Sequence, residues 1–142
     1  KSRPRHSNDN ALAETKNGAI IRKHMGYQHI AKNQANLVND FYDRYFNDYL
    51  NYHRPCAFAV IKISKKGKEM KNYPKENYLT PYAKLKSLPN SSTYLKENIT
   101  FEQLDKIAYQ TSHTEYAKTM QKEKTKLFNS ILTKPLTIQT LK

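Results

Sequence analysis

The spacing of apolar residues changes twice along this chain, and each change marks a different predicted element. From Lys32 to Tyr52 apolar and aromatic residues recur every three to four positions, the spacing of one side of an α-helix. In residues 57–73, AFAVIKISKKGKEMKNY, the β-formers Val60, Ile61 and Ile63 precede a KKGK turn. Helical spacing returns beyond residue 79. The pattern predicts a mainly α chain with one short β-hairpin.

Capping residues set the expected limits of the helices. A first helix should start near Ser7, Asn8 or Asp9 and end at Gly26, and Pro55 should stop the second. Later starts are expected at Thr80 before Pro81, at Thr100 with Gln103, and at Ser112 with Glu115.

Two apolar stripes need partners. The stripe of the second helix should be core, and it consists of Val38, Phe41, Tyr42, Tyr45, Phe46, Tyr49 and Leu50. The last helix has a stripe suited to packing within the chain or to a homo-oligomer, made of Ala117, Met120, Leu127, Phe128 and Ile131. Its tail, KPLTIQTLK, is expected to fray.

Composition adds a class of partner. The chain has 142 residues, suited to one modest domain or part of a larger one, and 25 Lys and Arg against 12 Asp and Glu give a net charge of +13. This charge favours a polyanion such as DNA. The single cysteine, Cys56, excludes an internal disulfide and suits a reducing cytoplasm. No apolar run approaches the roughly 20 residues of a membrane span, so no membrane partner is expected.

Basic residues gather at two places. One group lies on the predicted hairpin, near Tyr73 and Tyr78, where it could contact phosphates or discourage strand-edge association: Lys62, Lys65, Lys66, Lys68 and Lys71. The other lies around the first helix, where a DNA contact and a solvated face remain open: Arg3, Arg5, Lys16, Arg22 and Lys23.

Local signatures of other chemistry are few. The three glycines, Gly18, Gly26 and Gly67, are too scattered for a phosphate-binding loop. His53 and Cys56 form at most half a zinc site, to which His24 and His29 could add only through a coincidence of folding.

Glu14 is the strongest catalytic candidate, although a lone glutamate early in a helix usually complements the helix dipole. In SRPRHSNDNALAETKNG a proline loop at Pro4 leads to Glu14, with Asn17 three residues later. This stretch resembles the third acidic block of DDE transposase and integrase cores. FYDRYFNDYLNYHRPCAF resembles the superfamily's tyrosine- and asparagine-rich helix that ends in an Arg-Pro pair, here Arg54 and Pro55. The segment TPYAKLKSLPNSSTYLKENITFEQLDKIAYQTS resembles the helical tail of one bacterial branch of these transposases.

The resemblance implies the C-terminal portion of an RNase H-like domain with a helical tail. It implies strand cleavage and joining on DNA with Mg²⁺ or Mn²⁺, Glu14 as a metal ligand and Asn17 beside DNA. It divides the chain into 1–56, the end of the catalytic core; 57–78, a basic hairpin; and 79–142, a helical tail. Arg54 is expected to pin the second helix to the core.

The chain departs from the full family pattern upstream of Glu14. Two Mg²⁺ about 4 Å apart need clustered carboxylates, and the two expected aspartates have no matching strand context here. The nearby aspartates are better suited to cap or solvate helices, and they are Asp9, Asp40, Asp43 and Asp48. We therefore expect this chain alone to be inactive. A free-standing, non-catalytic basic DNA-binding protein or regulator remains the alternative.

Overall fold

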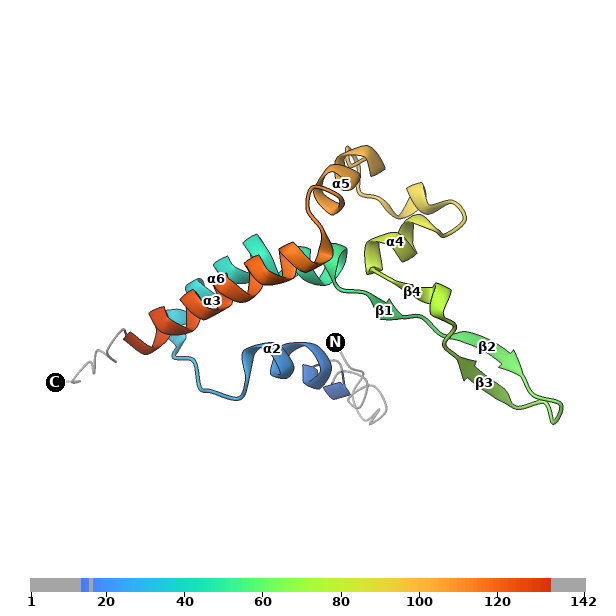
Figure 1. The fold of residues 1–142 in the computed structure, drawn as a ribbon, viewed down its shortest axis with the longest axis horizontal. Helices are drawn as coiled ribbons and strands as arrows, with labels where there is room; N and C mark the ends of the chain where they lie inside the picture. Colours follow the sequence, from blue (N-terminus) through green and yellow to red (C-terminus); the bar gives the residue numbers. More distant parts are fainter. Residues whose placement is uncertain (1–13, 16, 134–142) are drawn as a thin grey trace. The chain divides into compact units, whose positions relative to one another are not determined.

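The structure, a computed structural model, describes residues 14–15 and 17–133 (Figure 1). It divides into two compact units, Lys1–Ala35 and Asn36–Lys142. The described elements are η1 (Asn17–Arg22), α2 (Lys23–Met25), η2 (Lys32–Gln34), α3 (Ala35–Phe41), η3 (Tyr42–Phe46), η4 (Tyr49–His53), β1 (Cys56–Ala57), β2 (Val60–Ile63), β3 (Glu69–Asn72), η5 (Lys75–Asn77), β4 (Tyr78–Leu79), α4 (Pro81–Lys86), η6 (Ser91–Tyr94), α5 (Phe101–Ala108) and α6 (His113–Thr133). The mainly α character and the short hairpin are confirmed.

In the first unit the helical segment ends where the glycine signal placed it. α2 finishes at Met25, and Gly26 follows with a φ of 74°, a left-handed conformation that glycine adopts without strain. The expected N-caps, Ser7 to Asp9, lie outside the described residues.

The second predicted helix is present, with helical residues running without a break through 32–53. Its regular period is interrupted by the π-helical turns η3 and η4, which the sequence pattern did not predict. In an α-helix Phe41 and Phe46, five residues apart, would point about 140° away from each other. The wider π turn brings both onto one side, where their rings stack with centroids 5.8 Å apart.

The core of the second unit forms where α6 packs against η3 and η4. Phe41 and Phe46 are buried on one side, and Met120 and Leu127 of the α6 stripe are buried on the other. Figure 1 shows α6 running alongside the α3 helical segment. Met120 and Leu127 therefore serve packing within the chain. The predicted fraying tail, residues 134–142, lies outside the described residues.

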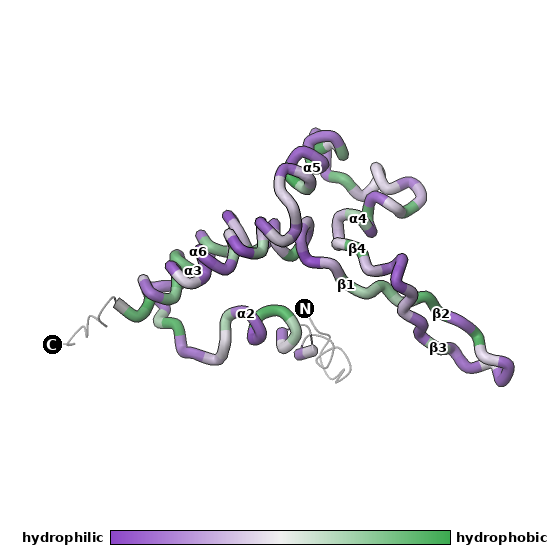
Figure 2. Tube along the Cα trace, in the orientation of Figure 1, coloured by the Kyte–Doolittle hydropathy of each residue, from purple (hydrophilic) through white to green (hydrophobic). Residues whose placement is uncertain are grey.

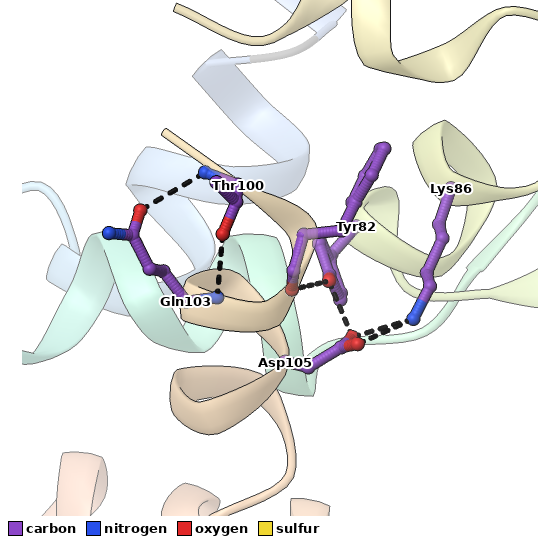
Figure 3. A network of polar contacts seen from close by, with 6 residues as sticks. Tyr82, Lys86, Thr100, Gln103 and Asp105 are labelled. Carbon is purple, nitrogen blue, oxygen red and sulfur yellow. Dashed lines mark hydrogen bonds and ion pairs between the residues drawn. The ribbon is translucent and has the colours of Figure 1, made fainter. Parts of the chain in front are cut away.

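The three predicted helix starts of the C-terminal half are confirmed by their hydrogen bonds. The Thr80 Oγ1 accepts from the Ala83 amide at 3.1 Å. The Thr100 amide donates to the Gln103 Oε1 at 3.0 Å, while the Thr100 Oγ1 accepts from the Gln103 amide at 3.3 Å (Figure 3). Ser112 and Glu115 exchange the same pair of bonds at the start of α6. Each cap satisfies backbone amides that would otherwise lack a partner.

A polar contact joins α4 to α5. The Tyr82 hydroxyl donates to Asp105 Oδ1 at 2.6 Å, and Lys86 Nζ donates to both carboxylate oxygens at 2.8 and 2.6 Å (Figure 3). Lys86 and Tyr82, in that order of effect, lower the pKa of Asp105 below its usual range. The carboxylate thus fixes the two short helices together.

Two separate pairs of strands lie in the second unit. β2 pairs antiparallel with β3, as predicted. β1 pairs antiparallel with β4, which the sequence did not indicate because each strand has only two residues. Among the described residues, no helix is both long and apolar enough to cross a membrane.

Candidate nucleic-acid interface

The β2–β3 hairpin is an exposed two-stranded ribbon. Every residue of both strands is exposed, so neither face packs on another described element. The register pairs Val60 with Asn72, Ile61 with Lys71, Lys62 with Met70 and Ile63 with Glu69. The ribbon is therefore held by its own backbone ladder and by what lies at its two ends.

The tip of the ribbon is a turn closed by backbone bonds. The Ser64 amide donates to the Lys68 carbonyl at 2.9 Å, and the Gly67 amide donates to the Ser64 carbonyl at 2.9 Å. The Ser64 Oγ also accepts from the Lys68 amide at 3.1 Å. Gly67 has a φ of 74°, which a side chain at that position would strain. These contacts fix the backbone that presents Lys65, Lys66 and Lys68.

At its base the ribbon is anchored by the β1–β4 pair. Cys56 pairs with Leu79 and Ala57 with Tyr78, and the Phe58 amide donates to the Asn77 carbonyl at 3.0 Å. β4 leads directly into Thr80 and α4, and β1 follows η4, so both strands of the ribbon are attached to helices at its base, whereas its tip is free. Sequence reasoning missed this anchor.

The lysines do not form a flat basic face. Residues paired across an antiparallel ladder share a side, so Lys62 with Met70 lies on one face and Lys71 with Ile61 on the other. The remaining three lysines, Lys65, Lys66 and Lys68, gather at the tip. In Figure 2 the tip and β3 are hydrophilic, whereas β2 is mixed. The charge is therefore concentrated at the end of the ribbon.

Electrostatically, the hairpin tip has little to neutralise it. Glu69 is the only acidic residue in 60–72, and no ion pair to any of the five hairpin lysines occurs within the described part of the chain. Tyr73 and Tyr78, which flank η5 near the base, are both exposed. An exposed two-stranded ribbon of this kind has the width that the major groove of B-DNA admits.

The residues predicted around the first helix are only partly described. Arg3, Arg5 and Lys16 lie outside the described residues. Asn17, Arg22 and Lys23 are exposed, and the Arg22 guanidinium lies 5.6 Å from the centroid of the Tyr27 ring. These three remain available to solvent, which fits both a DNA contact and a solvated face.

Glu14 does not fit a magnesium site by itself. It is helical and exposed, and among residues 14–15 and 17–133 no group of three or more His, Cys, Asp or Glu side chains could hold a metal. Hard cations need several oxygen ligands, and Glu14 offers one carboxylate. Asp9 lies outside the described residues.

The aspartates of the second helix have other surroundings. Asp40 pairs with Arg44 at 3.6 Å on the surface, and Asp43 is exposed. Burial raises the pKa of the half-buried Asp48 above its usual range.

His53 and Cys56, which form at most half a zinc site in the sequence, have different partners in the structure. Cys56 Sγ accepts from Arg54 Nη1 at 3.5 Å and donates to the Arg54 carbonyl at 3.6 Å, so the first residue of β1 is bonded to the residue that follows η4. His53 instead meets His113, 60 residues away, with their Nδ1 atoms 3.3 Å apart. No local signal in the sequence could have revealed that pair.

Searches with family models, curated proteins and solved structures gave no match to this chain.

Proposed function

We propose that this chain is a DNA-contacting part of a DDE-type transposase and that the tip of the β2–β3 hairpin is its phosphate-contacting arm. The observation that supports the arm is an exposed ribbon with three lysines at its tip, one more lysine on each face and one acidic residue. Phosphate contacts from lysine supply affinity without reading sequence. The proposed assignment to the DDE transposase family rests on the resemblance around Pro4, Glu14, Asn17 and the Arg54–Pro55 pair.

In this proposal the described residues bind and position DNA and perform no chemistry by themselves. The tip lysines meet phosphates first, because they stand at the free end of the ribbon. Lys62 and Lys71, on opposite faces, would meet phosphates on either side if the ribbon entered a groove. Strand transfer belongs to the intact catalytic domain, in which Glu14 would join two upstream aspartates as a ligand of Mg²⁺ or Mn²⁺.

Replacing the tip lysines should weaken DNA binding selectively. We expect the triple variant Lys65→Gln, Lys66→Gln, Lys68→Gln to lose affinity for duplex DNA and to flatten the dependence of log K on log salt by about 0.9 for each lost phosphate contact. Fluorescence anisotropy with a labelled duplex, repeated across a salt series, measures both quantities.

The matched control removes the same charge elsewhere. Lys106, Lys118 and Lys122 are exposed on α5 and α6, and their replacement by Gln lowers the net charge equally. The control should keep most of the affinity. Equal losses in the two triple variants would mean that net charge alone binds DNA, and the hairpin would not be the arm.

The family proposal has its own test. We expect the native coding DNA upstream of Lys1, translated in frame, to encode two aspartates on predicted strands. A start or stop codon close upstream would remove the partners of Glu14. The non-catalytic DNA-binding protein would then be the function to pursue.

A further inference from the structure

A buried histidine pair joins the end of η4 to the start of α6. His53 is only 2% exposed, and its ring stacks on Tyr116 with centroids 4.1 Å apart and planes 10° apart. Its Nδ1 lies 3.3 Å from Nδ1 of His113, the first residue of α6. Nothing in the proposed DNA contact uses these residues.

The buried side of His53 restricts where its proton can lie. The Nε2 atom of His53 is buried and has no hydrogen-bond partner among the described residues. A buried N–H without an acceptor is rarer in proteins than an under-used acceptor, so the proton of His53 belongs on Nδ1. His53 Nδ1–H then donates to Nδ1 of His113, whose exposed ring can hold its own proton at Nε2.

Protonation of either ring breaks this arrangement. A charged His53 has a second N–H, at Nε2, in a buried position without an acceptor. A charged His113 has an N–H at Nδ1, which points at the N–H of His53 unless His53 moves its proton to Nε2. Both routes leave a buried donor unpaired or place two donors face to face.

The other titratable groups around η4 do not compensate for a charge on His53. On α6, Glu115 is bound to Ser112, and Tyr116 remains neutral because burial raises the pKa of its hydroxyl to about 12. On α4 and α5, Tyr82 and Lys86 are bound to Asp105, while Lys84 lies over Phe58 and Lys106 is exposed. After burial, which is the larger cause, Asp48 of the same helical segment also raises the pKa of Tyr52 and of Tyr116. The pKa of His53 is lowered by burial and then by His113.

A metal bridge is a weaker explanation of the pair. If Nδ1 of His53 bound a metal, its proton would lie on the buried Nε2, although metal-bound histidines usually donate that N–H to an acceptor. No third His, Cys, Asp or Glu completes a metal-binding group within the described part of the chain.

We propose that the His53–His113 contact is a pH-sensitive latch, which holds the first turn of α6 against η4 while both imidazoles are neutral and releases it when either is protonated. The direction follows from linkage. Burial first, and then His113, lowers the pKa of His53. The stabilisation is complete above the ordinary histidine pKa of about 6.5 and is lost as the pH falls from there toward the lowered value.

The test uses the whole 142-residue chain. Long-range ¹H–¹⁵N correlation at pH 7.5, with excess EDTA, should show His53 as the Nδ1–H tautomer. Amide exchange, corrected for its intrinsic pH dependence, should show protection of the Tyr116 and Ala117 amides falling by about tenfold per pH unit below pH 6.5. The Leu127 amide, near the other end of α6, should lose much less of its protection from exchange.

Two variants separate the latch from general acid sensitivity. His113→Asn keeps an uncharged acceptor, so the amides in the first turn of α6 should lose less protection below pH 6.5. The control His29→Asn changes an exposed position in the first unit, and its first-turn amides should lose as much protection as those of the unchanged chain. An Nε2–H tautomer, equal losses at both ends of α6, or no difference between the variants would overturn the latch. A His53–His113 contact that disappears with EDTA would also overturn it, in favour of a metal bridge.

Discussion

Phe46→Ala should lower the free energy of unfolding by about 3–5 kcal/mol. Phe46 is 1% exposed, and its ring stacks on those of Phe41 and Tyr42 with centroids 5.8 and 5.2 Å apart. Truncation would leave a cavity where α6 packs against η3, and the neighbouring rings can fill it only in part. Urea denaturation followed by far-UV circular dichroism measures the loss.

The control for this variant is an exposed ring of the same unit. Tyr94→Ala, in η6, should change the stability by less than about 0.5 kcal/mol because its side chain is exposed. A loss below about 1 kcal/mol for Phe46→Ala would show that η3 and α6 do not form the core described above.

Tyr82→Ala should have a comparable effect, about 3–5 kcal/mol, through a different contact. Tyr82 is 5% exposed, and its ring lies 5.3 Å from that of Tyr52 and 6.3 Å from that of Phe101. Its loss would therefore loosen α4 from both η4 and α5. The same denaturation experiment measures it.

Tyr82→Phe separates ring packing from the hydroxyl. The Tyr82 hydroxyl donates a hydrogen bond to Asp105 Oδ1 at 2.6 Å, and in the variant Lys86 can still pair with that carboxylate. Phenylalanine should therefore retain most of the stability that alanine loses. If the two variants lost equal stability, the hydroxyl and not the ring would hold α4 in place.

Local signals predicted the helix limits that depend on caps and the β2–β3 hairpin. Thr80, Thr100 and Ser112 cap the helices that they were expected to start, and Gly26 ends its helix. Capping depends on side chains that reach backbone amides two or three residues away, so a short stretch of sequence contains the whole interaction. The hairpin is similarly local, because its two strands are joined by one short turn.

Pairings across long separations were not predictable in this way. His53 meets His113 across 60 residues, and Cys56 pairs with Leu79 across a hairpin. The π turns depend on the same tertiary context, since they bring Phe41 and Phe46 onto the side that faces α6. Neither periodicity nor capping reports which distant side chains will share a buried site.

The candidate functional residues were also found from local sequence, whereas their surroundings were decided by the tertiary structure. The lysine-rich turn was found from sequence, but its register decided that Lys62 and Lys71 lie on opposite faces and that charge gathers at the tip. Glu14 was found from a resemblance, and within the described residues it belongs to no group of three or more His, Cys, Asp or Glu side chains that could hold a metal.

The sequence by itself determined the helical and hairpin segments, their caps and the strong positive charge, because those properties arise from residues close together in the chain. Only the tertiary structure decided that Phe41 and Phe46 are the buried residues of the predicted stripe, that Tyr82 and Asp105 join α4 to α5, and that His53 is buried against His113. Burial and partner identity depend on segments brought together by folding, and their free energies come from water excluded at contacts that the linear order does not contain.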